Sequence, residues 1–159
     1  MQTAPYRARH EERTRLLASA LREGGGSVAL AKDTSNLFRD RASDARRRLD
    51  VRAFCDILSV DPAERVVEVE GMATYADLVE ATLAHGVMPA VVPQLKSITI
   101  GGAAAGIGIE ASSFRYGLAH ETLREIEVLT GTGEVFRCTP DNDHRDLFFG
   151  FPNSYGTLG

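Results

Sequence analysis

The residues that could do chemistry are concentrated in one small-residue segment, TIGGAAAGIGIEA, which runs from Thr99 to Ala111. Glycines stand at positions 101, 102, 106 and 108, and alanines at positions 103 to 105, so the backbone carries little side-chain bulk. Such a backbone can approach a ligand closely, and its N–H groups can point at phosphate oxygens. The same composition also lets two elements pack tightly. The segment alone therefore indicates either a pyrophosphate-binding segment or a packing contact.

The candidate cofactor-binding residues extend two positions beyond this segment. Glu110, the only carboxylate between Ile98 and Ala111, either hydrogen-bonds a ribose or holds the loop through a backbone contact. Ser112 and Ser113 can hydrogen-bond phosphate or other ligand atoms, or can cap a turn. The full candidate set is Thr99, Ile100, Gly101, Gly102, Ala103, Ala104, Ala105, Gly106, Ile107, Gly108, Ile109, Glu110, Ala111, Ser112 and Ser113.

A second motif within the segment is misleading. Residues 106–111, GIGIEA, match the GxGxxA fingerprint of Rossmann dinucleotide-binding domains. That fingerprint follows a strand and opens a helix, whereas here an extended stretch marked by Pro89 and Pro93 precedes the glycines. The chain then continues into SSFRYG and a hairpin pattern. The context therefore argues against Rossmann-type NAD binding.

Other kinds of site have little support in the sequence. Cys55 and Cys138 lack disulfide or zinc spacing, and no nucleophile elbow, metal motif or paired-carboxylate arrangement is present. The arginine run 46–48 is flanked by aspartates and has no interleaved aromatic residues, so we expect no nucleic-acid partner. His85 is expected to cap a helix, and His120 and His144 to be solvated. We therefore assign no metal ligands and no catalytic residues.

The composition fits one globular domain. The chain has 159 residues, of which 43% are hydrophobic and 25% charged, with a formal net charge of −4. No window approaches eighteen consecutive apolar residues, and the N-terminus is polar. We expect no transmembrane segment and a cytoplasmic location.

The elements that must position the candidate site alternate without a regular βα order. A helix is expected over 5–23, with Leu16, Leu17, Ala20 and Leu21 on its apolar face, followed by a strand at 27–31. Short strands are expected near 49–51, 57–60 and 66–70. These patterns predict an α+β domain rather than a doubly wound sheet.

The second half of the chain has clearer boundaries. Thr74 and Asp77 form a capping-box pair at the start of a helix that Gly86 closes. A hairpin is expected over 123–139, with positive φ angles at the glycines of its 131–133 turn. A short apolar turn follows at 147–149.

Several motifs together resemble a known family. These are residues 99–111, SSFRYGL, EVLTGTGEVFRCTP and DLFFGFPNSYGTLG, in this order along the chain. They resemble the FAD-binding domain of the vanillyl-alcohol-oxidase (PCMH) type and, more narrowly, the Delta(24)-sterol reductase (Diminuto or seladin-like) family. The resemblance covers residues from about 33 to 159. It implies a domain of two α+β subdomains in which the segment Thr99–Ala111 wraps FAD.

The resemblance also implies a domain organisation. Residues 1–26 would be an N-terminal helix and lead-in, and residues 27–159 the FAD-binding domain. We expect that domain to be truncated at its C-terminus, with the cap or substrate domain absent. The chain alone is then expected to be inactive, because catalytic residues in such enzymes come largely from the later part.

Two departures from the family pattern bear on how the flavin is held. The expected first flavin loop, from Lys32 to Asn36, reads KDTSN in place of a glycine-rich RGGGxS-like turn. Many relatives attach the flavin through a histidine in this loop or a cysteine before the TIGG-like segment. KDTSN contains no histidine and VVPQLKS no cysteine. The resemblance therefore implies noncovalent FAD.

The function implied by the resemblance is that of an FAD-dependent oxidoreductase. NAD(P)H would reduce the flavin, which would reduce an alkene of a small lipophilic substrate such as a sterol. Two alternatives stay open: an FAD-dependent alcohol or hydroxy-acid oxidase, and a flavin-binding fragment without catalysis of its own.

Overall fold

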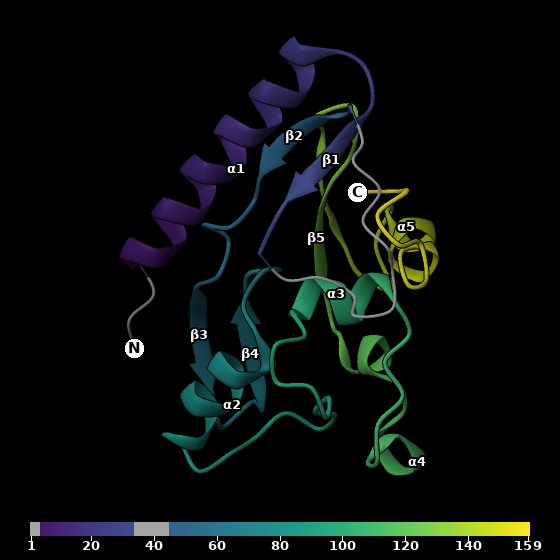
Figure 1. Cartoon of the computed structure of the whole chain (residues 1–159). Helices are drawn as coiled ribbons and strands as arrows, with labels where there is room; N and C mark the ends of the chain where they lie inside the picture. Colours follow the sequence, from purple (N-terminus) through teal and green to yellow (C-terminus); the bar gives the residue numbers. More distant parts are fainter. Residues whose placement is uncertain (1–3, 34–44) are drawn as a thin grey trace.

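The computed structural model describes residues 4–33 and 45–159. Helices and strands are mixed, as expected, and Figure 1 shows the short helix α3 near the centre of the molecule. The strands pair as three two-stranded sheets, β1–β2, β3–β4 and β5–β6. The elements, in chain order, are α1 (Ala4–Gly24), β1 (Val28–Ala31), β2 (Arg47–Asp50), β3 (Ile57–Asp61), β4 (Val66–Val69), α2 (Tyr75–Leu83), α3 (Ile100–Ala105), α4 (Ser113–Tyr116), η1 (Ala119–Thr122), β5 (Ile126–Leu129), β6 (Val135–Cys138) and α5 (Arg145–Gly150).

The N-terminal helix α1 matches the expected boundaries and ends at glycines 25 and 26, which have φ angles of 48° and 74°. Its inward face differs from the prediction. Ala18 and Leu21 are buried, whereas Leu16 is 53% exposed. The four apolar residues do not coincide with the buried face of the helix. Tertiary contacts decide which residues of an apolar stripe are covered.

The strands β1 and β2 lie parallel, with Val28 opposite Arg47 and Ala31 opposite Asp50. The Arg47 guanidinium donates to the Ala20 carbonyl at 3.1 Å, near the C-terminal end of α1. A cation at this end also interacts favourably with the helix dipole. This contact joins α1 to the first sheet.

The second sheet and α2 build the larger core. β3 and β4 are antiparallel, with an irregularity between Ile57 and Ser59. The expected capping box starts α2: the Thr74 hydroxyl accepts from the Asp77 N–H and the Asp77 carboxylate accepts from the Thr74 N–H. The helix ends at Leu83, and Gly86 follows with a φ of 73°. The buried residues of this core are Tyr75, Leu78, Val91, Ala103 and Ala119.

The C-terminal hairpin forms the other core. β5 and β6 pair in antiparallel register as expected, but only Gly133 of the two turn glycines has a positive φ, at 79°. The apolar turn expected at 147–149 is the helix α5. Its Phe148 packs with Val128 and Cys138 to form the buried part of this cluster.

Candidate cofactor-binding site

The small-residue segment folds into the helix α3 and a following loop. Thr99 caps the helix: its hydroxyl accepts from the Gly102 N–H at 3.2 Å, and the residue is 4% exposed. The sequence did not predict a helix here, since glycine disfavours helix interiors. Tertiary packing stabilises the helix instead, because Ala103 and Ala104 are buried and Ala103 belongs to the larger core.

Gly101 is needed for a close backbone contact. Its N–H donates to the Gly71 carbonyl at 2.7 Å, and the neighbouring Ile100 N–H donates to the Ala73 carbonyl at 2.9 Å. A Cβ at position 101 would lie 2.8 Å from the Gly71 oxygen. On this side of α3 the packing interpretation of the glycines is correct.

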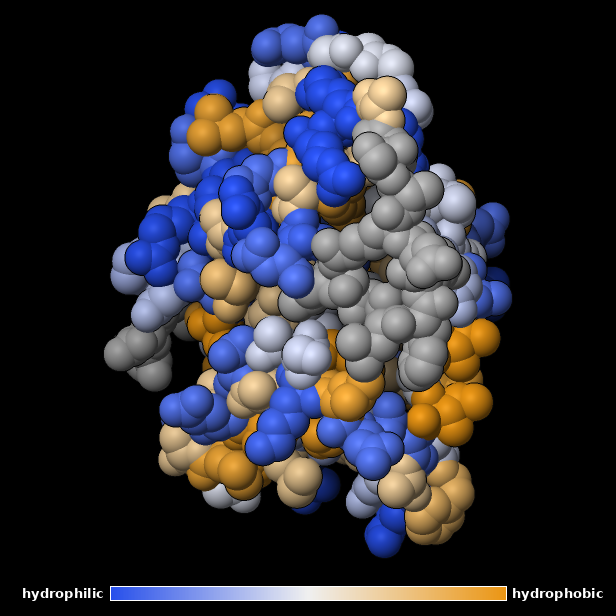
Figure 2. Space-filling view, viewed as in Figure 1, coloured by the Kyte–Doolittle hydropathy of each residue, from blue (hydrophilic) through white to orange (hydrophobic). Residues whose placement is uncertain are grey.

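The opposite side of the segment is open. Gly102, Ile107, Ile109 and Ala111 are exposed, while Gly106 is buried at the end of the helix. Figure 2 shows hydrophobic surface along the loop that leads from α3 and over α4, where Phe114 is 91% exposed. A ligand can therefore lie against bare backbone and aliphatic side chains here. The exposed side is accessible to a cofactor, while the buried side serves packing.

The polar residues of the segment fasten the loop to residues 90–94. The Glu110 carboxylate accepts from the Gln94 N–H at 3.2 Å, and the Ser112 hydroxyl donates to the Ala90 carbonyl at 2.9 Å. The Ser113 hydroxyl accepts from the Glu110 N–H at 3.0 Å. Of the two roles considered for Glu110, the structure contains the backbone contact. Burial, and then the Glu110 charge, raise the pKa of the nearby Tyr75.

A loop near the C-terminus also contacts α3. The Tyr155 N–H donates to the Ala105 carbonyl at 3.0 Å. Asn153 and Tyr155 have φ angles of 63° and 51°, which are uncommon for residues other than glycine. The Ser154 hydroxyl oxygen is buried and has no hydrogen-bond partner among the described residues. The sequence assigned no site residue here, because the PNSYG run offers no local signal of its contact with α3.

The expected first flavin loop is only partly described. Lys32 and Asp33 belong to the described residues, and 34–36 lie outside them. The Asp33 Oδ1 atom lies 3.9 Å from the Arg52 Nη1 atom.

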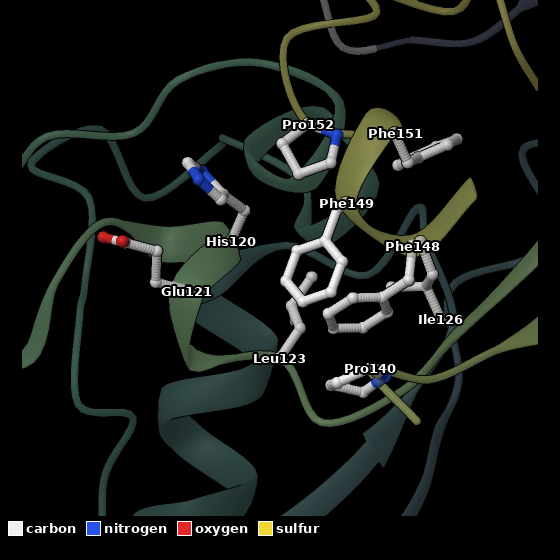
Figure 3. Close-up of a pocket in the computed structure, with 9 residues that line it drawn as sticks. All are labelled: His120, Glu121, Leu123, Ile126, Pro140, Phe148, Phe149, Phe151 and Pro152. Atoms are coloured by element: carbon white, nitrogen blue, oxygen red, sulfur yellow. The ribbon is translucent and has the colours of Figure 1, made fainter. Parts of the chain in front are cut away.

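A cavity of about 400 Å³ lies between η1 and α5 (Figure 3). η1 connects this cavity to the candidate segment, since the Ala119 N–H donates to the Gly108 carbonyl at 3.1 Å. The lining residues are His120, Glu121, Leu123, Ile126, Pro140, Phe148, Phe149, Phe151 and Pro152.

Two histidines differ from the solvated side chains that the sequence predicted. The His120 Nδ1 atom is buried and has no hydrogen-bond partner in the described parts of the chain. The His144 ring packs on Phe136 with ring centroids 4.8 Å apart. Both differ because tertiary neighbours cover them.

Residues 4–33 and 45–159 contain neither a cluster of metal-ligand side chains nor a membrane-spanning helix. Within these ranges, no group of three or more His, Cys, Asp or Glu side chains has an arrangement that could hold a metal ion. No helix in the same ranges is both long enough and apolar enough to cross a membrane.

Comparison with known proteins defines the class. The model of the family described as "FAD binding domain" matches residues 6–139. The chain therefore belongs to this family of PCMH-type FAD-binding domains.

Among curated proteins, the chain is similar to Delta(24)-sterol reductases. It is 35% identical to the Pisum sativum enzyme over 111 residues, covering 70% of this chain and 20% of that protein. It is 38% identical to the Homo sapiens enzyme over 104 residues, covering 65% of this chain and 20% of that protein. It is also 37% identical to cytokinin dehydrogenase 7 from Oryza sativa over 93 residues, covering 58% of this chain and 18% of that protein. The chain thus spans about a fifth of the length of these relatives.

A solved structure shares the fold. The crystal structure of 6-hydroxy-D-nicotine oxidase from Arthrobacter nicotinovorans matches with a TM-score of 0.74 at 22% sequence identity. The match covers 91% of this chain and 31% of the oxidase. At this identity the similarity establishes the fold alone, a PCMH-type flavoprotein fold.

Proposed function

We propose that this chain binds FAD noncovalently along residues 99–113, as the flavin-binding part of an FAD-dependent oxidoreductase. The observation that carries the proposal is the exposed, side-chain-poor face of the segment in a member of an FAD-binding family. When bound, FAD supplies the capacity to accept and donate a hydride. The protein contributes binding and orientation.

Within the segment, the proposal separates contact residues from supporting residues. Gly102, Ile107, Ile109 and Ala111 are exposed and available to a ligand. The buried residues Thr99, Ala103, Ala104 and Gly106 set the position of the backbone. The Ser154 hydroxyl, in the loop bonded to α3, has no hydrogen-bond partner among residues 4–33 and 45–159 and is a further polar group near the segment.

A direct test is titration of the 159-residue chain with FAD, followed by flavin fluorescence. Saturable quenching that riboflavin does not reproduce supports binding through the ADP part of FAD, which contains the pyrophosphate. Acid precipitation of the complex then tests attachment: free flavin in the supernatant supports noncovalent binding, and a yellow pellet contradicts it.

For the whole protein, we propose a reductase that transfers electrons from NAD(P)H to an alkene of a lipophilic substrate such as a sterol. The support is the similarity to Delta(24)-sterol reductases at 35% to 38% identity. The test is anaerobic mixing of the flavin-loaded protein with NADPH. Bleaching of the flavin band near 450 nm is expected, and a flavin that stays oxidised contradicts the reductase.

Two other functions compete with it. An oxidase that returns electrons to oxygen gains support from the similarity to a cytokinin dehydrogenase and from the fold of 6-hydroxy-D-nicotine oxidase. It predicts flavin reduction by an alcohol or hydroxy-acid substrate and hydrogen peroxide on admission of air. A flavin-binding module without turnover predicts FAD binding with neither reaction.

The proposal keeps the division into a lead-in, residues 1–26, and an FAD-binding domain, residues 27–159. It also keeps a cytoplasmic location, which fractionation of cells expressing the tagged protein tests. Recovery of the protein in a membrane or secreted fraction would contradict that location.

A further inference from the structure

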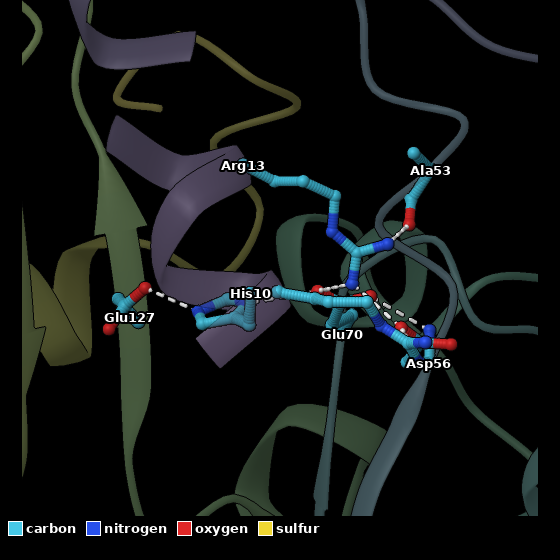
Figure 4. Close-up of polar contacts among 7 residues, drawn as sticks. His10, Arg13, Ala53, Asp56, Glu70 and Glu127 are labelled. Carbon is cyan, nitrogen blue, oxygen red and sulfur yellow. Dashed lines mark hydrogen bonds and ion pairs between the residues drawn. The ribbon is translucent and has the colours of Figure 1, made fainter. Parts of the chain in front are cut away.

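A buried carboxylate joins the N-terminal helix to the second sheet. Glu70 directly follows β4, and its side chain is 0% exposed. Its Oε1 atom lies 2.8 Å from both His10 Nδ1 and Arg13 Nη2, while its Oε2 accepts from the Asp56 N–H at 2.8 Å. Figure 4 shows His10 and Arg13 reaching from α1 toward this carboxylate. All the hydrogen-bonding partners that a buried carboxylate requires are thus in place.

His10 connects this carboxylate to the third sheet. Its Nε2 atom lies 2.9 Å from the Glu127 carboxylate in β5. Both ring nitrogens therefore face carboxylate oxygens, which only accept, so the imidazole is doubly protonated. Hydrogen bonds to Glu127 and then to Glu70 raise the pKa of His10 to about 9.

Arg13 connects the same carboxylate to the loop before β3. Its Nη2 atom lies 2.7 Å from Asp56 Oδ2, and its other terminal nitrogen donates to the Ala53 carbonyl. Two backbone hydrogen bonds link the same two segments: the Glu70 N–H donates to the Asp56 carbonyl, and the Met72 N–H donates to the Phe54 carbonyl. The turn that follows β4 is therefore fixed on its outer side.

The inner side of this turn carries the candidate cofactor segment. The Gly71 carbonyl accepts from the Gly101 N–H at 2.7 Å, and the Ala73 carbonyl accepts from the Ile100 N–H at 2.9 Å. Gly71 is the next residue in the chain after the buried Glu70. A displacement of Glu70 therefore moves the backbone on which α3 rests.

We propose that His10 and Arg13 are positioning residues for the cofactor segment: by holding Glu70, they fix the Gly71 backbone against which Gly101 is seated. The inference rests on the proposed function for the assignment of residues 99–113 to FAD. The contacts from α1 to α3 themselves are independent of that assignment.

The test is amide hydrogen exchange of the flavin-free chain and of its R13Q and H10Q variants. Exchange at Gly101 and Ile100 is expected to accelerate at least tenfold. Exchange at Leu78 in α2 and Phe148 in α5 is expected to change less than twofold, because their amides bond within their own helices. R15Q is the matched control, since Arg15 lies on the same helix and pairs only with exposed Glu12 in the described contacts.

Equal acceleration at all four amides would overturn the proposal, since the network would then support only global stability. Unchanged exchange at Gly101 would overturn it too. The R13K variant keeps the cation, and partial recovery of Gly101 protection is expected. If R13Q does not fold, the same four amides are compared between R13K and H10Q. Faster exchange at Gly101 and Ile100 than at Leu78 and Phe148 then supports the proposal, and equal acceleration contradicts it.

A second readout is the Kd for FAD, expected to rise about tenfold in R13Q and H10Q and to stay unchanged in R15Q. A wild-type chain that binds no FAD would contradict the proposed function, while hydrogen exchange would still decide the coupling between α1 and α3. Normal FAD affinity in variants with accelerated Gly101 exchange would contradict the positioning role and leave the proposed function intact.

Discussion

Gly101 and Glu70 have opposite chemistry and act on the same turn. Gly101 lacks a side chain, so its backbone contacts the Gly71 carbonyl directly. Glu70, the residue before Gly71, is held in place by its buried carboxylate. The close contact tolerates no added atom, since a gap below 3 Å is shorter than carbon–oxygen van der Waals contact. At the residue scale, the position of the candidate segment thus depends on one missing Cβ and one satisfied carboxylate.

The substitution G101A is expected to destabilise the chain by roughly 1 to 3 kcal/mol, the usual cost of overpacking, and to weaken FAD binding. Urea unfolding and FAD titration measure the two effects. G131A is the matched control: Gly131 has no described atom within 4 Å of its Cβ position and no positive φ. A change of less than 0.5 kcal/mol is expected there on the scale of ordinary surface substitutions. Equal losses in both variants would contradict the close-contact explanation.

The His10 contacts predict a pH dependence of stability. The folded pKa of about 9 lies above the ordinary value of 6.5, so the contribution is fully present below pH 6.5 and is lost as the pH rises through 9. We expect a loss on the order of 1 kcal/mol after discounting for solvent screening of the partly exposed ring. Urea unfolding at pH 6, 8 and 10 measures it. The H10Q variant is expected to lack this loss, and an identical pH profile in H10Q would contradict the assignment.

Short elements dominate the candidate site at the next scale. α3 has six residues and includes two glycines, so it is too short to be stable in isolation. Its N-cap Thr99, the bonds to Gly71 and Ala73 and the buried alanines together compensate. α2 begins with a threonine cap of the same kind: the Thr74 backbone pairs with that of Thr99 in an isolated bridge, but the Thr74 hydroxyl bonds with Asp77 of α2. The two caps therefore allow stability and binding to be separated.

The variants T99A and T74A are each expected to lower the free energy of unfolding by about 1 kcal/mol, because each removes an N-cap hydrogen bond. Only T99A is expected to raise the Kd for FAD, since Thr99 caps the helix of the candidate segment. Denaturant unfolding and flavin titration on the same samples check both statements. Weaker FAD binding in T74A of the same size as in T99A would contradict the local role of Thr99.

On the scale of the whole molecule, α1 unites the three sheets. It contacts the first through Arg47, the second through Glu70, and the third through Glu127 and the Gly133 carbonyl, to which Arg22 donates at 2.6 Å. In Figure 1, α1 runs along the upper left of the molecule beside β1 and β2, and its N-terminal end lies above β3. Among the described residues of α1, only Ala18 and Leu21 are buried apolar residues. The polar contacts are therefore the main specific links between α1 and the sheets.

FAD is expected to stabilise the folded chain as a whole. At a concentration of 100 times its Kd, a ligand that binds only the folded state adds about 2.7 kcal/mol to the free energy of unfolding. Thermal unfolding with FAD, and with riboflavin as the control lacking the pyrophosphate, measures this effect. Equal shifts with both compounds would contradict a pyrophosphate contact, and the absence of any shift with FAD would contradict binding.

The sequence by itself determined the family, the mixed α+β class and most elements. Capping at Thr74 and Asp77, the hairpin and the glycine end of α1 depend on neighbours within a few positions, so their patterns are local.

The tertiary structure alone decided that residues 100–105 form a helix, which face of α1 is buried and what surrounds His120. It also decided the meeting of His10 with Glu70 and Glu127, which lie 60 and 117 positions away. An arginine and a histidine three residues apart on a polar helix face were the available signal, but this pattern is common on solvated helices. Contacts over such separations depend on how the elements pack, and no local pattern encodes them.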